Sequence, residues 1–191
     1  MKKFLSFLLV IITVMGLLSG CRMSGSEQTD GTENGAKSAL EILQKTWDQF
    51  SDDEKFPVYG GDAANMVDGA PGEFAVSDTE GLQYNLIVPE SQLASIEQAA
   101  SLAHGMMVNN FTCGVYKLKD GANTETFADA VRSAYQDNQW LCGQPESLLI
   151  AEVDDRYVLA AFGLTDVLTI LRDKLVAAYP NTQVKYKEAI G

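Results

Sequence analysis

The order of strand and helix patterns over residues 107–191 limits this chain to a small number of folds. Segments rich in β-branched and aromatic residues predict strands over residues 108–118, 148–153, 157–162 and 182–186. Two segments with apolar residues at helical spacing separate them, one capped by Asn123 or Thr124 and one by Thr165. The resulting order is β-α-β-β-α-β.

This order matches the split-βαβ arrangement of ferredoxin-like domains. The pair Asp154-Asp155 predicts a tight turn, so we expect residues 148–162 to form a β-hairpin. Residues 107–191 are therefore predicted to be a βαββαβ core of the α+β class, with an antiparallel sheet and helices on one face. A different α+β sandwich, with another strand order, is the alternative.

Residues 37–106 are predicted to form a helical and loop extension that packs on this core. A spacing of three and four indicates a helix over residues 37–52, with an apolar face of Leu40, Leu43, Trp47 and Phe50. Residues 56–81 are rich in Gly, Pro, Asp and Ala, and they predict a loop with short extended pieces, long enough to be of the kind that often serves function. Pro89 predicts the start of a second helix, with an apolar face of Leu93, Ile96, Ala100 and Ala103.

The first 21 residues carry the pattern of an export signal. Two lysines precede an apolar run over residues 4–18, which is shorter than the roughly 20 residues of a membrane-spanning helix. We therefore expect residues 1–20 to be a signal peptide. The end of this segment, Leu18-Ser19-Gly20-Cys21, closely resembles a bacterial lipobox, which implies cleavage before Cys21 and diacylglycerol on its sulfur. An ordinary secretory signal with an incidental Cys is the alternative.

Residues 21–36 are predicted to be the lipidated Cys21 and a flexible tether, because Ser, Gly, Thr and acidic residues dominate residues 22–36. A chain of this length has an r.m.s. reach of about 20 Å. The expected location is the extracytoplasmic face of the cell membrane, with the lipid on Cys21 as the attachment.

The net charge of the chain disfavours some classes of binding partner. The full sequence has a net charge of −12, and removal of residues 1–20, which hold two lysines and no acid, changes it to −14. A protein this acidic is unsuited to the phosphates of nucleic acid. Electrostatic attachment to anionic lipid is disfavoured for the same reason, so the expected membrane attachment is covalent.

Four short motifs resemble, in their order, a family of clostridial exported proteins and lipoproteins of unknown function. They are Ala99-Ala100-Ser101-Leu102, Asn109-Asn110-Phe111-Thr112, Trp140-Leu141-Cys142-Gly143 and Tyr157-Val158. The resemblance spans residues 56–187 and implies a Gram-positive envelope protein. Some members are labelled bacteriocin transport accessory protein, and the family brings no functional residues to this sequence. Some proteins with that label are thioredoxin-like, but the Cys-x-x-Cys pair of that chemistry is absent from this chain.

Two cysteines remain once Cys21 is assigned to the lipid. Cys113 lies within a predicted strand and Cys142 follows the next predicted helix. Outside the cytoplasm a disulfide between them could persist, and it would stabilise the fold by about 3 kcal/mol. Two buried free thiols are the alternative.

Catalytic and metal-binding patterns are weak in this sequence. The single histidine, His104, follows Ser101 by three residues without forming a recognisable triad. The sequence contains no His-x-x-x-His, Cys-x-x-Cys or Asp-x-Asp-x-Asp-Gly motif, so we expect no metal site and no cofactor. The acidic clusters Asp52-Asp53-Glu54 and Asp154-Asp155 are typical of solvated turns.

Two classes of function fit these observations. The first is a non-catalytic envelope module that binds a protein, a peptide or a wall component near the membrane. The second is a small extracytoplasmic hydrolase that uses a carboxylate pair. Two buried carboxylates about 5–10 Å apart in a cleft would favour the hydrolase, whereas an exposed apolar groove would favour binding.

Overall fold

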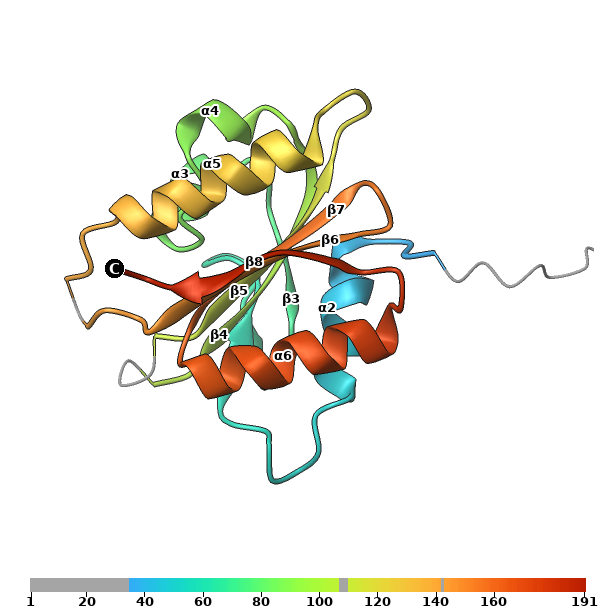
Figure 1. The fold of residues 1–191 in the computed structure, drawn as a ribbon, viewed down its shortest axis with the longest axis vertical. Helices are drawn as coiled ribbons and strands as arrows, with labels where there is room; N and C mark the ends of the chain where they lie inside the picture. The colour runs from blue at the N-terminus through green and yellow to red at the C-terminus, as the bar shows by residue number, and fades with distance from the viewer. Residues whose placement is uncertain (1–34, 107–109, 142) are drawn as a thin grey trace, which may run out of the picture. The chain divides into compact units, whose positions relative to one another are not determined.

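An open antiparallel sheet of eight strands is the framework of the structure (Figure 1). This computed structural model describes residues 35–106, 110–141 and 143–191. The strands are β1 (Val58–Gly60), β2 (Val67–Asp68), β3 (Gly72–Phe74), β4 (Ile96–His104), β5 (Thr112–Leu118), β6 (Ser147–Val153), β7 (Tyr157–Gly163) and β8 (Gln183–Ala189). Their order is β2-β1-β4-β5-β7-β6-β8, and β3 also pairs with β4. The α+β class and the antiparallel sheet are confirmed.

The helices begin at side-chain caps where the sequence offers them. They are α2 (Ala39–Asp48), α3 (Thr79–Tyr84), α4 (Glu90–Leu93), α5 (Thr124–Asp137) and α6 (Thr165–Ala178). Ser38 caps α2 and Asn123 caps α5, each by accepting a main-chain N–H in the first turn. Thr165, expected to be a cap, is instead the first residue of α6, and its N–H donates to the Glu146 carboxylate at 2.9 Å.

Helices cover both faces of the sheet, so the expectation of helices on one face is wrong. In Figure 1, α5 lies with α3 and α4 on one side of the sheet, and α2 lies with α6 on the other. One buried cluster holds Leu43 of α2 and Leu171 of α6, and the other holds Phe127 of α5 and Leu82 of α3. Each face of the sheet therefore has its own hydrophobic core.

Crossover handedness explains this arrangement. The connections β5–α5–β6 and β7–α6–β8 both step in the same direction across the sheet, each passing over one strand. Because β5 and β7 are antiparallel, two right-handed crossovers in one direction must place their helices on opposite faces. Both helices would share a face only if β8 returned to the side of β5.

The strand β4 occupies that side of β5. The sequence pattern had predicted a helix for the residues of this strand. Only the short α4 follows Pro89, and residues 96–104 form the longest strand of the structure. Ile96 and Ala99 face the α5 side, whereas Ala100 and Leu102 face the α2 side. A strand buried on both faces shows no alternation of polar and apolar residues, so its pattern resembles that of a buried helix. Residues 37–106 therefore contribute strands to the same sheet as residues 107–191.

Candidate functional site

A groove of about 630 Å³ lies beside β3. Three segments line it: the first turn of α2, the stretch that holds β2 and β3, and the beginning of β4. We call it the edge groove. Its wall combines apolar side chains with carboxylates, among them Leu40, Val67, Val76, Glu73 and Glu97.

Two glycines allow β3 to replace β1 as the strand that pairs with β4. β1 pairs with β4 at Ala103 and His104, and β3 pairs with it at residues 99–101. Where one strand replaces the other, a Cβ on Gly60 would lie 2.1 Å from the main-chain nitrogen of Gly72. No side chain fits at this crossing, which accounts for part of the glycine content of residues 56–81.

Asp62 holds the chain in place next to this crossing. Its side chain is 4% exposed, and it accepts hydrogen bonds from the N–H groups of Ala64, Asn65 and Ala75 at 2.8–3.0 Å. The Asn65 side-chain amide donates to the same carboxylate. These bonds, first that from Ala75, hold the pKa of Asp62 below its usual value. Asp62 thus acts as a structural clamp that keeps its charge.

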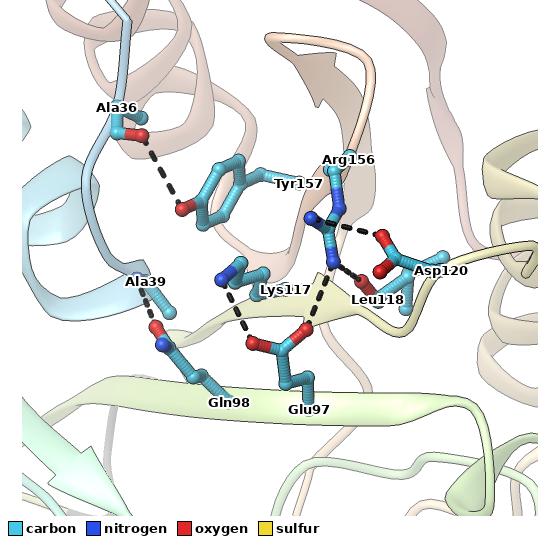
Figure 2. Close-up of polar contacts among 9 residues, drawn as sticks. All are labelled: Ala36, Ala39, Glu97, Gln98, Lys117, Leu118, Asp120, Arg156 and Tyr157. Carbon is cyan, nitrogen blue, oxygen red and sulfur yellow. Dashed lines mark hydrogen bonds and ion pairs between the residues drawn. The ribbon is translucent and has the colours of Figure 1, made fainter.

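A network of charged side chains lies at the start of β4, at one end of the groove (Figure 2). The register between β4 and β5 shifts between Ile96 and Gln98, and this irregularity sets the direction of Glu97. Glu97 accepts hydrogen bonds from Lys117 Nζ and from Arg156, both at 2.8 Å. The bond from Lys117 is the main reason that the pKa of Glu97 lies below its usual value. Arg156 also pairs with Asp120 at 3.1 Å.

The point where the chain enters the domain lies beside the groove. The Tyr157 hydroxyl donates to the Ala36 carbonyl at 3.3 Å, as Figure 2 shows. The Ala36 N–H donates to the Asp154 carboxylate at 2.6 Å. Three residues later α2 begins, and the Ala39 N–H donates to the side-chain oxygen of Gln98 in the groove at 3.4 Å. The end of the predicted tether is therefore fixed to the β6–β7 hairpin, two residues before Ser38 of the groove wall.

The sequence-predicted cysteine sites are only partly within the described residues. Cys113 is fully buried on the α2 side of β5, and this burial raises the pKa of its thiol far above the usual value. Cys21 and Cys142 lie outside the described residues. Lipidation of Cys21 and the Cys113–Cys142 disulfide therefore stay predictions.

His104 and Ser101 have separate structural contacts at the end of β4. Nδ1 of His104 lies 3.0 Å from the main chain of Met106, and its ring stacks on Phe56 with centroids 5.0 Å apart. The Ser101 hydroxyl donates to the Gly61 carbonyl at 3.1 Å. The two side chains make no hydrogen bond with each other within the described part of the chain, so nothing there activates a serine nucleophile.

The acidic clusters occupy turns, as the sequence predicted. Glu54 pairs with Lys174 of α6 at 2.7 Å, which ties the end of α2 to α6. Asp154 and Asp155 both have positive φ and connect β6 to β7. Among residues 35–106, 110–141 and 143–191, no group of three or more His, Cys, Asp or Glu side chains is placed to hold a metal ion.

Several features of the groove had no signal in the sequence. Glu97 and Gln98 reach it only because residues 96–104 form a strand, and the periodicity had favoured a helix there. Glu73 stood within a predicted loop, and only its pairing to Ala100 places it at the groove. The apolar residues of the 96–104 segment gave no indication that acidic and amide side chains would lie together at the edge groove.

Comparisons with known proteins add no name to this site. The chain matches no family model, no curated protein and no solved structure. In the described segments, no helix has both the length and the apolar character needed to cross a membrane. Fold and site together define an α+β protein with a groove beside the edge of a sheet that has helices on both faces.

Proposed function

We propose that this chain is a lipid-anchored extracytoplasmic protein whose domain binds another envelope component in the edge groove, without chemistry of its own. The main support for this proposal is the position of the groove next to Ala36, the end of the predicted tether. A domain held at this point presents the groove close to its own attachment. A partner that lies at or leaves the membrane would therefore reach the groove first.

The predicted lipobox at Cys21 and the polar segment after it support this location. The resemblance to clostridial exported lipoproteins supports the same setting. The label that some family members carry would make the bound component part of a peptide export system. We propose this setting together with the binding role.

The carboxylates of the groove favour binding over hydrolysis. A hydrolase that uses a carboxylate pair needs one acid whose pKa is raised, so that it is protonated at neutral pH. Asp62 and Glu97 both have a lowered pKa, because hydrogen bonds stabilise their charged forms. Asp62 is also fully occupied in holding the main chain. Neither side chain is prepared to donate a proton to a substrate.

Two experiments test the proposal. Metabolic labelling with a fatty acid should mark the wild-type protein and fail for Cys21→Ala, and labelling that persists in this variant contradicts the anchor. A photo-crosslinking residue at Val76, in the groove wall, should capture a partner in intact membranes. The same residue at Val176 of α6 is the control, because both valines are exposed and Val176 lies outside the groove. Equal capture at both positions contradicts a role for the groove.

A further inference from the structure

The edge of β4 is uncovered where it borders the groove. On this edge β1 covers Ala103 and His104, and β3 covers residues 99–101. After Phe74 the chain leaves β4, because the N–H of Ala75 donates to Asp62. Within the described segments, no strand pairs with residues 96–98 on this side. This leaves the main chain at Glu97 without a strand beside it, where β4 borders the groove.

The charged groups of the groove are all acidic. The Glu73 side chain is exposed, and its carboxylate makes no hydrogen bond or ion pair with another residue of the described segments. Glu97 is paired with Lys117 and Arg156, yet its side chain remains 39% exposed. The lining contains no lysine or arginine. An occupant with positive charge would find a partner at Glu73 that this chain does not itself supply.

Apolar side chains stand between these charges. Leu40 comes from α2, Val67 from β2 and Val76 from the segment after β3. Val67 and Val76 are each 40% exposed, so they offer apolar surface that no neighbour covers. The groove therefore combines apolar contacts with acidic ones, which suits an extended peptide that carries both kinds of side chain.

We propose that the edge groove binds an extended peptide segment containing lysine or arginine, which adds to the open edge of β4 as a short strand. This inference rests on the proposed binding function and names its partner. Main-chain hydrogen bonds to β4 at Glu97 would supply affinity. Alternate side chains of the peptide would reach Glu73 and the apolar wall, which would select for positive charge.

Binding of short peptides to the purified, anchored protein tests this inference. The probe is a fluorescent heptapeptide that alternates Lys with Val, measured by anisotropy in detergent solution. A peptide with Glu in place of Lys should bind at least about tenfold more weakly, and added salt should weaken the Lys peptide. Methylation of alternate main-chain nitrogens should also cost about tenfold, because it removes donors that a strand needs.

Protein variants locate the binding site. Glu73→Gln should weaken the Lys peptide about tenfold. Glu80→Gln removes another exposed carboxylate, on α3, and should leave binding unchanged. Val76→Lys provides a second test, because it places a positive charge on the groove wall and should repel the same peptide. Both substituted groove residues are exposed, so the fold should tolerate the changes.

The outcomes separate this inference from the function on which it rests. Equal binding of the Lys and Glu peptides, or full tolerance of N-methylation, overturns the proposed strand addition. If the Lys peptide does not bind while Val76 still captures a membrane partner specifically, the peptide inference fails and the binding function stands. If the groove captures nothing and binds no peptide, both fail.

Discussion

Ala36 and Asp154 are joined by a hydrogen bond of 2.6 Å, although 118 positions separate them in the sequence. The donor is the main-chain N–H at the end of the predicted tether, and the acceptor is a carboxylate in the β6–β7 turn. Tyr157 of the same hairpin binds the Ala36 carbonyl. The hairpin thus determines where the chain enters the domain and, through α2, the position of one wall of the groove.

Glycine substitutions in the β6–β7 turn should separate this contact from the turn itself. Asp154 and Asp155 both have positive φ, which glycine adopts without strain. Asp154→Gly removes the acceptor for Ala36, so hydrogen exchange at residues 36–39 should become faster. Asp155→Gly leaves that contact intact and should stabilise the protein by about 0.5–1 kcal/mol. Unchanged exchange in Asp154→Gly would contradict the role of this bond.

Alanine at Gly60 should be costly even though the backbone there is unstrained. The added Cβ would meet the main chain of Gly72, which cannot move without displacing β3 from β4. We expect a loss of about 3 kcal/mol in the free energy of unfolding, measured by urea denaturation.

Gly69 provides the control for this substitution. It has a φ of +75° and open space around its Cα, so Gly69→Ala should cost only the backbone strain, about 1 kcal/mol. A smaller loss for Gly60→Ala than for Gly69→Ala would show that β1 and β3 do not cross as described.

The acid side of the stability curve should depend on Asp62. Its pKa is lower in the folded protein than in the unfolded chain, so the folded state binds fewer protons there. The stabilisation is complete above the unfolded pKa of about 3.9 and is lost as pH falls through the lower, folded value. Asp62→Asn should reduce stability at neutral pH and weaken the dependence on pH below about 4.

Denaturation at pH 7 and at pH 3 measures this effect. If Asp62→Asn loses as much stability at low pH as at neutral pH, the charge of the carboxylate does not hold the loop. Asp68→Asn is the matched control, because Asp68 is an exposed carboxylate of the neighbouring strand β2.

The Cys113 thiol should be inert in the native protein. It is fully enclosed, and burial raises its pKa, so almost no thiolate exists at pH 8. A thiol reagent should not modify it before the protein unfolds, and rapid native labelling would contradict this environment. The mass of the alkylated, unfolded and unreduced protein then reveals whether Cys113 is bonded to Cys142.

Sequence reasoning succeeded where an element has one solvated side or where a clear turn marks its end. The helix α5 shows its apolar face clearly, and the β6–β7 hairpin is marked by Asp154-Asp155. It failed at residues 96–104, because helices cover both faces of β4 and leave no polar alternation. That error also led to the wrong topology. Because β4 pairs with the free side of β5, β8 cannot lie there and pairs with β6 instead.

The groove could not be predicted from the sequence for a related reason. Its residues come from positions 38–40, 62–76 and 97–99, and only strand pairing brings them together. The Gly-rich stretch was correctly singled out as unusual, but its reason is a crossing of two backbones at Gly60 and Gly72. No local pattern in a sequence encodes a contact between two glycines.

The last strand, β8, has a consequence for a protein concentrated on a surface. It ends the sheet, and its sequence from Gln183 to Ala189 includes Lys185 and Lys187. If two molecules paired their β8 strands antiparallel around Tyr186, each Lys185 would face a Lys187. Like charges placed opposite each other oppose such pairing. If the chain is anchored as proposed, its molecules could therefore crowd together in the plane of a membrane without fusing their sheets into fibres.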